Sequence, residues 1–189
     1  MTPAEILSVA RIAKVNHAGE YGAMRIYGAQ ILVSRMLWPR LVPLIVGLRG
    51  HEIAQCGLFR QAMKARDVRP CRAMFFWSWG GFVLGLMTAL LGPKAVWACT
   101  EAVDATVHHH LTAQLAFLKT RDAGLFDLIT SIRAEEEGHL NLAIREKGPV
   151  GVALHGLEGV VRASVHAVVW LSNWGASGRM SRDLARSAA

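Results

Sequence analysis

Apolar residues recur at helical spacing through most of the chain and predict an all-α protein. In a helix, residues three and four apart share a face, so an apolar stripe marks the side that packs inward. The inward-facing stripe of the first predicted helix includes two polar residues among apolar ones and consists of Ala13, His17, Glu20, Met24, Tyr27 and Ile31. We expect long helices over about 5–37, 40–66, 94–121, 124–147 and 152–174, and a shorter one over 73–92.

The first helix carries a start signal and two unusual glycines. Thr2 and Glu5 have the spacing of a capping box, in which each side chain satisfies the backbone of the other. Gly19 and Gly22 flank Glu20, although each weakens a helix by roughly 1 kcal/mol relative to Ala. We therefore expect them to permit close approach of a neighbouring helix or of a ligand.

Glu136 and His139 are the first candidates for chemistry. They lie three residues apart, so both project from the apolar face of the predicted helix over 124–147. Burying a carboxylate and an imidazole unpaired is costly, and a metal ion would satisfy both. Glu-x-x-His on a core-facing helix is the ligand unit of di-iron four-helix bundles. A simpler interpretation is also open, with Glu135 to Glu137 as a solvated acidic run and His139 as a satisfied core histidine.

The spacing of this pair is repeated in the first half of the chain. Glu20, Glu52 and Gln55 are separated by steps of 32 and 3, and the same steps separate Asp104, Glu136 and His139. Each position falls on the apolar face of its segment. The repeat predicts a single bundle domain over 1–189, in which two helix pairs meet around a shared site.

Carboxylate and imidazole ligands suit iron, whereas an all-sulfur site would suit zinc or clusters. Two irons need about six protein ligands and open positions for dioxygen. We expect Glu20, Glu52 and Gln55 to serve one half of the site. Asp104, Glu136 and His139 would then serve the other half.

The amino-acid composition favours association with a membrane surface. Of the 189 residues 52% are hydrophobic and 19% charged, and 21 basic against 14 acidic residues give a net charge of +7. The basic residues lie beside apolar segments, as Arg179, Arg182 and Arg186 follow Trp170 and Trp174. This favours an anionic lipid surface over a nucleic acid, with a solvated tail as the alternative for these arginines. The three cysteines form no Cys-x-x-Cys pair, and we identify no signal peptide. Both observations favour a reducing cytoplasmic compartment.

The segment 73–93 contains no charged residue over 21 positions, enough to span a bilayer at about 1.5 Å per residue. A full span would put Glu20 and Glu52 on the opposite side from Asp104 and Glu136, so we expect a short helix at the membrane interface. A re-entrant hairpin is the alternative. The residues expected to face the membrane or a lipid substrate are Phe75, Phe76, Trp77, Trp79, Phe82 and Leu86.

Several runs make the sequence similar to the demethoxyubiquinone hydroxylases of ubiquinone biosynthesis, which are membrane-associated di-iron proteins of the ferritin-like superfamily. The runs are Val-Asn-His-Ala-Gly-Glu-Tyr-Gly-Ala at 15–23, Arg-Ile-Tyr at 25–27, Val-Arg-Pro at 68–70, Gly-Phe at 81–82, Thr-Ala-Leu-Leu-Gly at 88–92, Ala-Cys-Thr-Glu-Ala-Val at 98–103 and Glu-Glu-Glu-Gly-His at 135–139. The resemblance extends from about Arg11 to Trp174.

The resemblance implies a ferritin-like bundle with two additional apolar helices and a di-iron monooxygenase activity. The substrate would be a polyprenylated demethoxy-ubiquinol, hydroxylated with dioxygen and electrons from a reduced nicotinamide. The implied location is the cytoplasmic face of the cell membrane, or the matrix face of the inner mitochondrial membrane. A lipid-binding partner and a homodimer are also implied.

Two residues depart from the family pattern, which has His in place of Gln55 and Glu in place of Asp104. The Gln carbonyl is a neutral and weaker donor than imidazole, and Asp is shorter by roughly one C–C bond. The histidines His51, His108 and His110 are candidates for compensating ligands or for supporting groups, and Gln55 itself is open to a supporting role. His109 also aligns with family histidines, whereas Leu111 replaces a Tyr.

Three functions are therefore open. The first is an active quinol hydroxylase, favoured by Glu20, Glu52, Glu136 and His139. The second is a catalytically impaired quinone- or lipid-binding relative that acts as a scaffold in the same pathway, favoured by Gln55 and Asp104. The third is an iron-binding ferritin-like protein without quinone chemistry.

Overall fold

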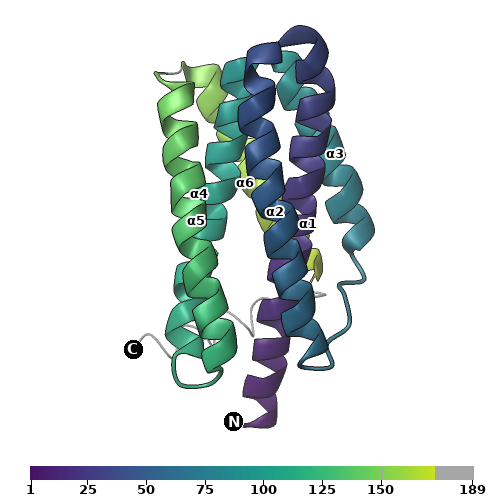
Figure 1. Cartoon of the computed structure of the whole chain (residues 1–189), viewed down its shortest axis with the longest axis vertical. Coiled ribbons are helices and arrows are strands. Elements are labelled where there is room, and N and C mark those ends of the chain that lie inside the picture. The colour runs from purple at the N-terminus through teal and green to yellow at the C-terminus, as the bar shows by residue number, and fades with distance from the viewer. Residues whose placement is uncertain (150, 173–189) are drawn as a thin grey trace.

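A computed structural model describes residues 1–149 and 151–172, and helices with short connections make up almost all of these residues (Figure 1). No strand occurs among these residues. The elements are α1 (Pro3–Leu37), the 3₁₀ turn η1 (Pro39–Leu41), α2 (Val42–Lys64), α3 (Met74–Leu91), α4 (Pro93–Leu118), α5 (Ala123–Lys147) and α6 (Val152–Ser172). The predicted all-α class is confirmed.

Two of the bundle helices, α1 and α5, begin at side chains that cap them. The Thr2 backbone N–H donates to Glu5 Oε2 at 2.7 Å, and the Glu5 N–H donates to Thr2 Oγ1 at 3.3 Å. At the start of α5, Asp122 Oδ1 accepts from the Leu125 N–H at 2.9 Å, and Arg66 pairs with the same carboxylate at 2.6 Å. These contacts satisfy N–H groups that have no partner within the first turn of a helix.

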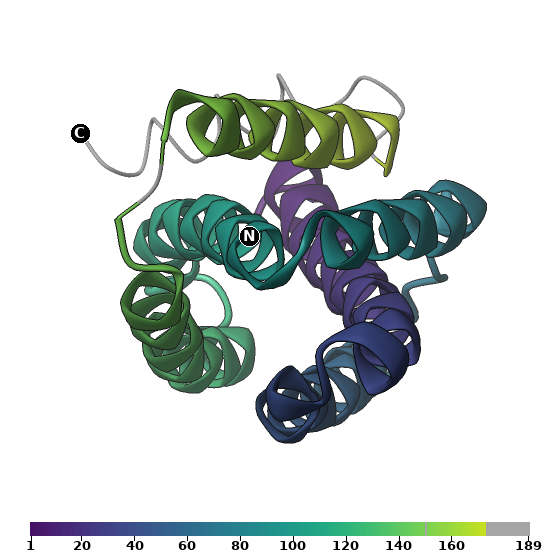
Figure 2. The ribbon, with the colours of Figure 1, turned by 90° about the horizontal axis from the view of Figure 1, so that it is seen from above.

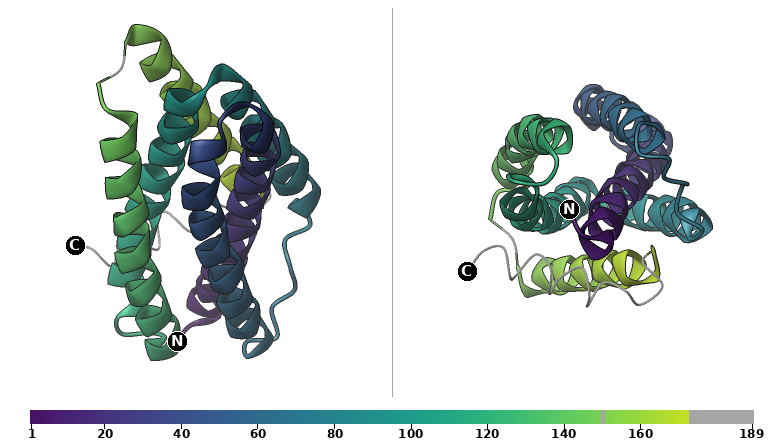
Figure 3. Two further views of the ribbon diagram at one scale, coloured as in Figure 1. Left: turned by 45° about the horizontal axis from the view of Figure 1, so that its top comes forward. Right: turned by 90° about the horizontal axis from the view of Figure 1, so that it is seen from below.

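Four helices form the bundle, and two lie outside it. α1 packs along α2, and α4 along α5, so each half of the chain supplies one hairpin of helices. Figure 2 shows α6 across one side of the molecule and α2 with α5 on the opposite side, with α1, α3 and α4 between them; the view from below in Figure 3 agrees. The predicted four-helix bundle with two additional apolar helices is confirmed.

Two apolar clusters fill the bundle and leave a polar level between them. One cluster lies towards the start of α1 and includes Ile12, Phe59, Leu111, Phe117, Leu125 and Ile129. The other lies towards the end of α1 and includes Tyr27, Ile31, Ile45, Leu48, Val96 and Trp97. Along every bundle helix, the candidate ligand positions fall between these clusters. Any side chain at this level is therefore sealed from water at both ends of the bundle.

α3 approaches α1 so closely that glycine is required at the contact. A Cβ added to Gly85 would lie 2.2 Å from the Ile26 carbonyl oxygen, and one added to Gly81 would lie 2.6 Å from the Gly22 oxygen. A Cβ on Gly22 would in turn lie 2.6 Å from the Trp77 ring. The expectation of a close helix contact therefore holds for Gly22, whereas Gly19 has no neighbour within 4 Å of such a Cβ.

The outward face of α3 is strongly apolar. Phe75, Phe76 and Trp79 are each more than half exposed. Trp77 differs from them, because its ring packs on Gly22 and its Nε1 donates to Ser172 Oγ at 2.6 Å. Length and composition alone would let α3 cross a membrane, and among the described helices this holds only for α3.

The other two residues expected on this surface, Phe82 and Leu86, are half-buried on α3. The Arg25 guanidinium lies 5.4 Å from the centre of the Phe82 ring, and Leu86 packs against the apolar cluster near the end of α1. Their side chains therefore join α3 to the bundle as well as bordering its outer face.

A buried ion cluster fastens α6 to the bundle. Lys147 Nζ lies 2.6 Å from Glu101 Oε2 on α4 and 2.6 Å from Glu158 Oε1 on α6. Lys147 is 8% exposed and Glu158 is 5% exposed, so the cluster is largely shielded from solvent. The predicted last helix reached position 174; Trp174 and the basic residues Arg179, Arg182 and Arg186 lie outside the described residues.

Candidate metal centre

One acidic side chain from each bundle helix turns into the polar level between the apolar clusters. Glu20 comes from α1, Glu52 from α2, Asp104 from α4 and Glu136 from α5, and none is more than 5% exposed. Because each half of the chain is a helical hairpin, residues at similar distances from its turn lie opposite each other. The repeated step of 32 residues thus brings the four acids to one place in the tertiary structure.

His139 faces the same point as these acids. Its Nδ1 atom lies 3.5 Å from Glu136 Oε1 and 3.7 Å from Glu52 Oε1. Ligand atoms of Glu52, Glu136 and His139 all lie within 4.8 Å of one another, a separation that one metal ion can bridge. The Glu-x-x-His pair is therefore a buried constellation in this fold, and the interpretation of a solvated acidic run does not hold for Glu136.

Burial and mutual repulsion oppose ionisation of the acids in the absence of a cation. Desolvation, followed by the charge of Glu136, raises the pKa of Glu20 from 4.5 to about 8. Desolvation, again followed by the charge of Glu136, raises the pKa values of Glu52 and Asp104 well above those of ordinary carboxyl groups. Metal ions that bind to such a group of acids would displace their protons.

Several buried polar atoms at this level have no hydrogen-bond partner within the protein. They are His139 Nδ1, Glu136 Oε1, Asp104 Oδ2 and Gln55 Oε1. Buried polar atoms are nearly always paired, so these atoms call for a ligand. Three oxygen atoms and one imidazole nitrogen form the donor set that suits iron, and the residues present therefore fit the metal expected from the sequence.

Gln55 is buried at 1% exposure, and its amide group contacts a carboxylate outside the four acids. Its Nε2 donates to Glu135 Oε2 at 2.9 Å, which fixes the orientation of the amide and leaves Oε1 unpaired. His51 lies one turn earlier on α2, and its Nδ1 is 2.8 Å from His139 Nε2. The structure thus places His51 behind His139, on the side away from the carboxylates.

The other two candidate histidines lie further along α4. His108 and His110 are half-buried, with His108 Nδ1 and His110 Nε2 unpaired within the protein. The His110 ring packs edge-on against that of His166, with 5.4 Å between ring centres. Desolvation, followed by the neighbouring His166, lowers the pKa of His110 to about 4, so it is neutral at physiological pH.

An inner cavity of about 460 Å³ leads away from the acids between α1, α3, α4 and α6. Glu20, Glu52, Asp104 and Glu136 line its polar part, and the rest is formed mainly by apolar side chains. Gly19, which precedes Glu20, also borders it, as do Gly80 and Gly81 of α3. The cavity has the size and the mixed lining of a small-molecule site.

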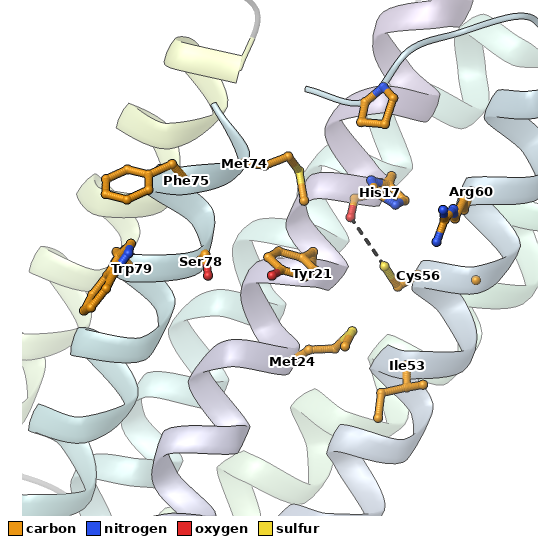
Figure 4. A pocket seen from close by; sticks show the side chains of 12 residues that line it. His17, Tyr21, Met24, Ile53, Cys56, Arg60, Met74, Phe75, Ser78 and Trp79 are labelled. Carbon is orange, nitrogen blue, oxygen red and sulfur yellow. Dashed lines mark hydrogen bonds between the residues drawn. The ribbon is translucent and has the colours of Figure 1, made fainter. Parts of the chain in front are cut away.

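A second hollow of about 710 Å³ lies between α1, α2 and the start of α3 (Figure 4). His17, Cys56 and Arg60 line one side of it, and Phe75 and Trp79 line the other. Met24, which we expected on the inward stripe of the first helix, lines this outer groove instead. None of the four acids borders the groove, so it is separate from the candidate centre.

A known protein family matches most of the chain. The family described as "Ubiquinone biosynthesis protein COQ7" matches residues 8–172. The chain belongs to the COQ7 family. The match covers all six helices almost completely, and the resemblance expected from the sequence is confirmed.

Relatives from distant organisms have similar names. A Bos taurus protein named NADPH-dependent 3-demethoxyubiquinone 3-hydroxylase, mitochondrial, is 34% identical over 169 residues, which cover 87% of this chain and 77% of the relative. A Rhodospirillum rubrum protein named 3-demethoxyubiquinol 3-hydroxylase is 32% identical over 174 residues, covering 90% and 80%. A Saccharomyces cerevisiae protein named 5-demethoxyubiquinone hydroxylase, mitochondrial, is 30% identical over 184 residues, covering 87% and 79%.

The structure also assigns contacts that sequence reasoning missed. Asn16 Nδ2 donates to Gln114 Oε1 at 2.8 Å, and Gln114 Nε2 donates to Asn16 Oδ1 at 3.3 Å, forming a buried pair beside the inner cavity. Tyr27 is buried near Glu52, where desolvation and then the charge of Asp104 raise its pKa. Amides on apolar helix faces are a signal for such pairs, but 98 residues separate these two in the chain.

Proposed function

We propose that this chain is a di-iron monooxygenase that hydroxylates the ring of a polyprenylated demethoxy-ubiquinol in ubiquinone biosynthesis. The observation that carries the proposal is the group of four buried acids and His139 at the polar end of an apolar cavity. The hydroxylase names of the COQ7 relatives support the choice of substrate.

The acids supply charge as well as ligand atoms. Two ferrous ions would bring four positive charges, which Glu20, Glu52, Asp104 and Glu136 would balance when ionised. This neutralisation removes the desolvation and repulsion that keep the acids protonated without metal. His139 Nδ1 and Gln55 Oε1, both buried and unpaired, would complete the ligand sets of the two halves.

The iron pair, when bound, would activate dioxygen so that one oxygen atom enters a ring C–H bond and the other leaves as water, using two electrons that originate from a reduced nicotinamide. The protein residues orient the substrate and keep the site dry. The apolar clusters at either end of the bundle exclude water from the acids. The inner cavity, lined by Val83, Leu84 and Met87 of α3, would hold the quinol ring against the polar end.

The outer face of α3 supports peripheral attachment to a membrane, because Phe75, Phe76 and Trp79 are exposed at its start. A lipid-soluble quinol would then pass from the bilayer into the cavity that α3 borders. The proposed location is the cytoplasmic face of a cell membrane, or the matrix face of the inner membrane in a mitochondrion. The mitochondrial relatives are consistent with the second.

Iron content and product formation test the proposal together. We expect anaerobically purified protein to hold about two irons per chain. It should convert a demethoxy-ubiquinol to the hydroxylated quinol with a reductant and ¹⁸O₂, placing one labelled atom in the product by mass spectrometry. Glu136→Gln should lose both iron and product. Glu137→Gln is the matched control, because Glu137 is the exposed neighbour on the same helix.

Two results would refute the hydroxylase. One is wild-type protein that stays metal-free when iron is ample. The other is iron-loaded protein that forms no hydroxylated quinol. If metal-free protein still bound the quinone, the scaffold function favoured by Gln55 and Asp104 would be supported instead.

A further inference from the structure

His51 contacts His139 from behind the candidate centre. Its Nδ1 atom lies 2.8 Å from His139 Nε2, and the two ring planes are inclined by only 15°. The ring centres are 5.1 Å apart. The ring centres are almost as far apart as a 2.8 Å contact between two ring nitrogens allows. Both nitrogens must therefore lie nearly on the line that joins the ring centres. The N–H bond and the acceptor lone pair of an imidazole point in this direction, so the contact is a well-aligned hydrogen bond.

The two nitrogens of His139 therefore have different neighbours. Nδ1 faces Glu52 and Glu136 and has no hydrogen-bond partner, whereas Nε2 faces His51. An imidazole that ligates a metal through Nδ1 must carry its proton on Nε2. His51 Nδ1 can accept a hydrogen bond from the His139 Nε2–H when the proton of the neutral His51 ring is on His51 Nε2. A metal-bound histidine usually donates its second N–H to such an acceptor, which fixes the ring and increases the basicity of the ligating nitrogen.

We propose that His51 is a positioning residue that holds His139 in the tautomer and orientation needed for metal binding through Nδ1. This inference rests on the proposed metal site. It concerns a residue outside the six candidate ligands. His51 occupies the position just before Glu52 on α2, so the same helix supplies a carboxylate and the support for an imidazole from α5.

The arrangement also explains how this chain manages with one imidazole fewer among its candidate ligands. The Gln55 carbonyl oxygen is a weaker metal ligand than an imidazole nitrogen, and the Gln55 amide N–H₂ donates to Glu135. The only imidazole in the ligand set is then His139, and its donor strength matters more. A hydrogen bond to His51 strengthens that single nitrogen donor without adding a charge to the buried site.

Metal affinity tests the proposal without reference to catalysis. Ferrous iron would be titrated anaerobically against a competing chelator into wild type, His51→Ala and His51→Asn. We expect His51→Ala to weaken iron binding by about 10- to 100-fold, the usual effect of removing such a support. His51→Asn should restore most of the affinity, because the Asn carbonyl oxygen can accept near the position of Nδ1. His155→Ala, at an exposed histidine of α6, is the control.

The tautomer of His139 provides a second test, which needs no metal. Long-range ¹H–¹⁵N spectra of metal-free wild type should show His139 protonated at Nε2, and His51→Ala should shift the ring to a mixture of tautomers. Unchanged iron affinity and an unchanged tautomer in His51→Ala would overturn the proposal. So would His51→Asn binding as weakly as His51→Ala, because a hydrogen-bond acceptor at this position would then give His139 no support. Wild type without iron would refute the proposed function, while the tautomer measurement would still decide the role of His51.

Discussion

Replacing Glu20 with glutamine should stabilise the metal-free protein while abolishing its metal site. Glu20 is buried at 5% exposure, and its pKa is raised from 4.5 to about 8. In Glu20→Gln, the carboxamide keeps an oxygen that can accept the hydrogen bond from Glu52. The substitution therefore removes the ionisable group and leaves the packing nearly unchanged.

The magnitude follows from the difference between the folded and unfolded pKa values. At neutral pH the folded protein keeps the Glu20 proton, whereas the unfolded chain releases it. The raised folded pKa thus makes stability fall as the pH rises from about 4.5 to about 8. At 1.36 kcal/mol per pH unit, the free energy of unfolding of wild type is lowered by about 3 kcal/mol at neutral pH. Glu20→Gln has no ionisable group here and does not lose this stability. For a chain of this size, its Tm should therefore be higher by roughly 6–12 °C.

Thermal unfolding of chelator-treated wild type and Glu20→Gln would be followed by circular dichroism near pH 5 and near pH 7. We expect the difference between the two proteins to be small at the lower pH and to grow towards neutrality. Ferrous iron should then raise the Tm of wild type but not of the variant. Equal pH dependence of the two proteins, or a variant less stable at neutral pH, would refute the assignment of a buried, protonated Glu20.

Two further sets of substitutions test how the outer helices are attached. Gly85→Ala should destabilise the fold by roughly 1–3 kcal/mol in chemical denaturation, because its Cβ would meet the Ile26 carbonyl oxygen. Gly80→Ala on the same helix, where the added Cβ meets nothing within 4 Å, should instead be neutral or stabilising by up to about 1 kcal/mol. Lys147→Met should cost roughly 3–5 kcal/mol by leaving Glu158 without its buried cation, and adding Glu158→Leu should recover part of that loss. An equal effect of the two glycine variants, or no cost in Lys147→Met, would contradict these contacts.

Much of the fold follows from local patterns in the chain. Apolar residues at helical spacing predict the helices, and Thr2 with Glu5 predicts where the first one begins, because these signals depend on neighbours within a turn or two. The repeated step of 32 residues between Glu20 and Glu52, and between Asp104 and Glu136, predicts that the acids meet. That inference needs only two helical hairpins of similar length.

Contacts between distant segments depended on how the helices dock. Helical periodicity assigns Met24 and Trp77 to a face of a helix, but docking of α3 on α1 left Met24 in the outer groove and turned Trp77 inward against Gly22. The tertiary structure likewise paired Gln55 with Glu135, and His51 with His139 across 88 residues of chain. The physical reason is that the sequence specifies which side of a helix a residue occupies. The rotation and spacing of the packed helices specify which partner it meets there.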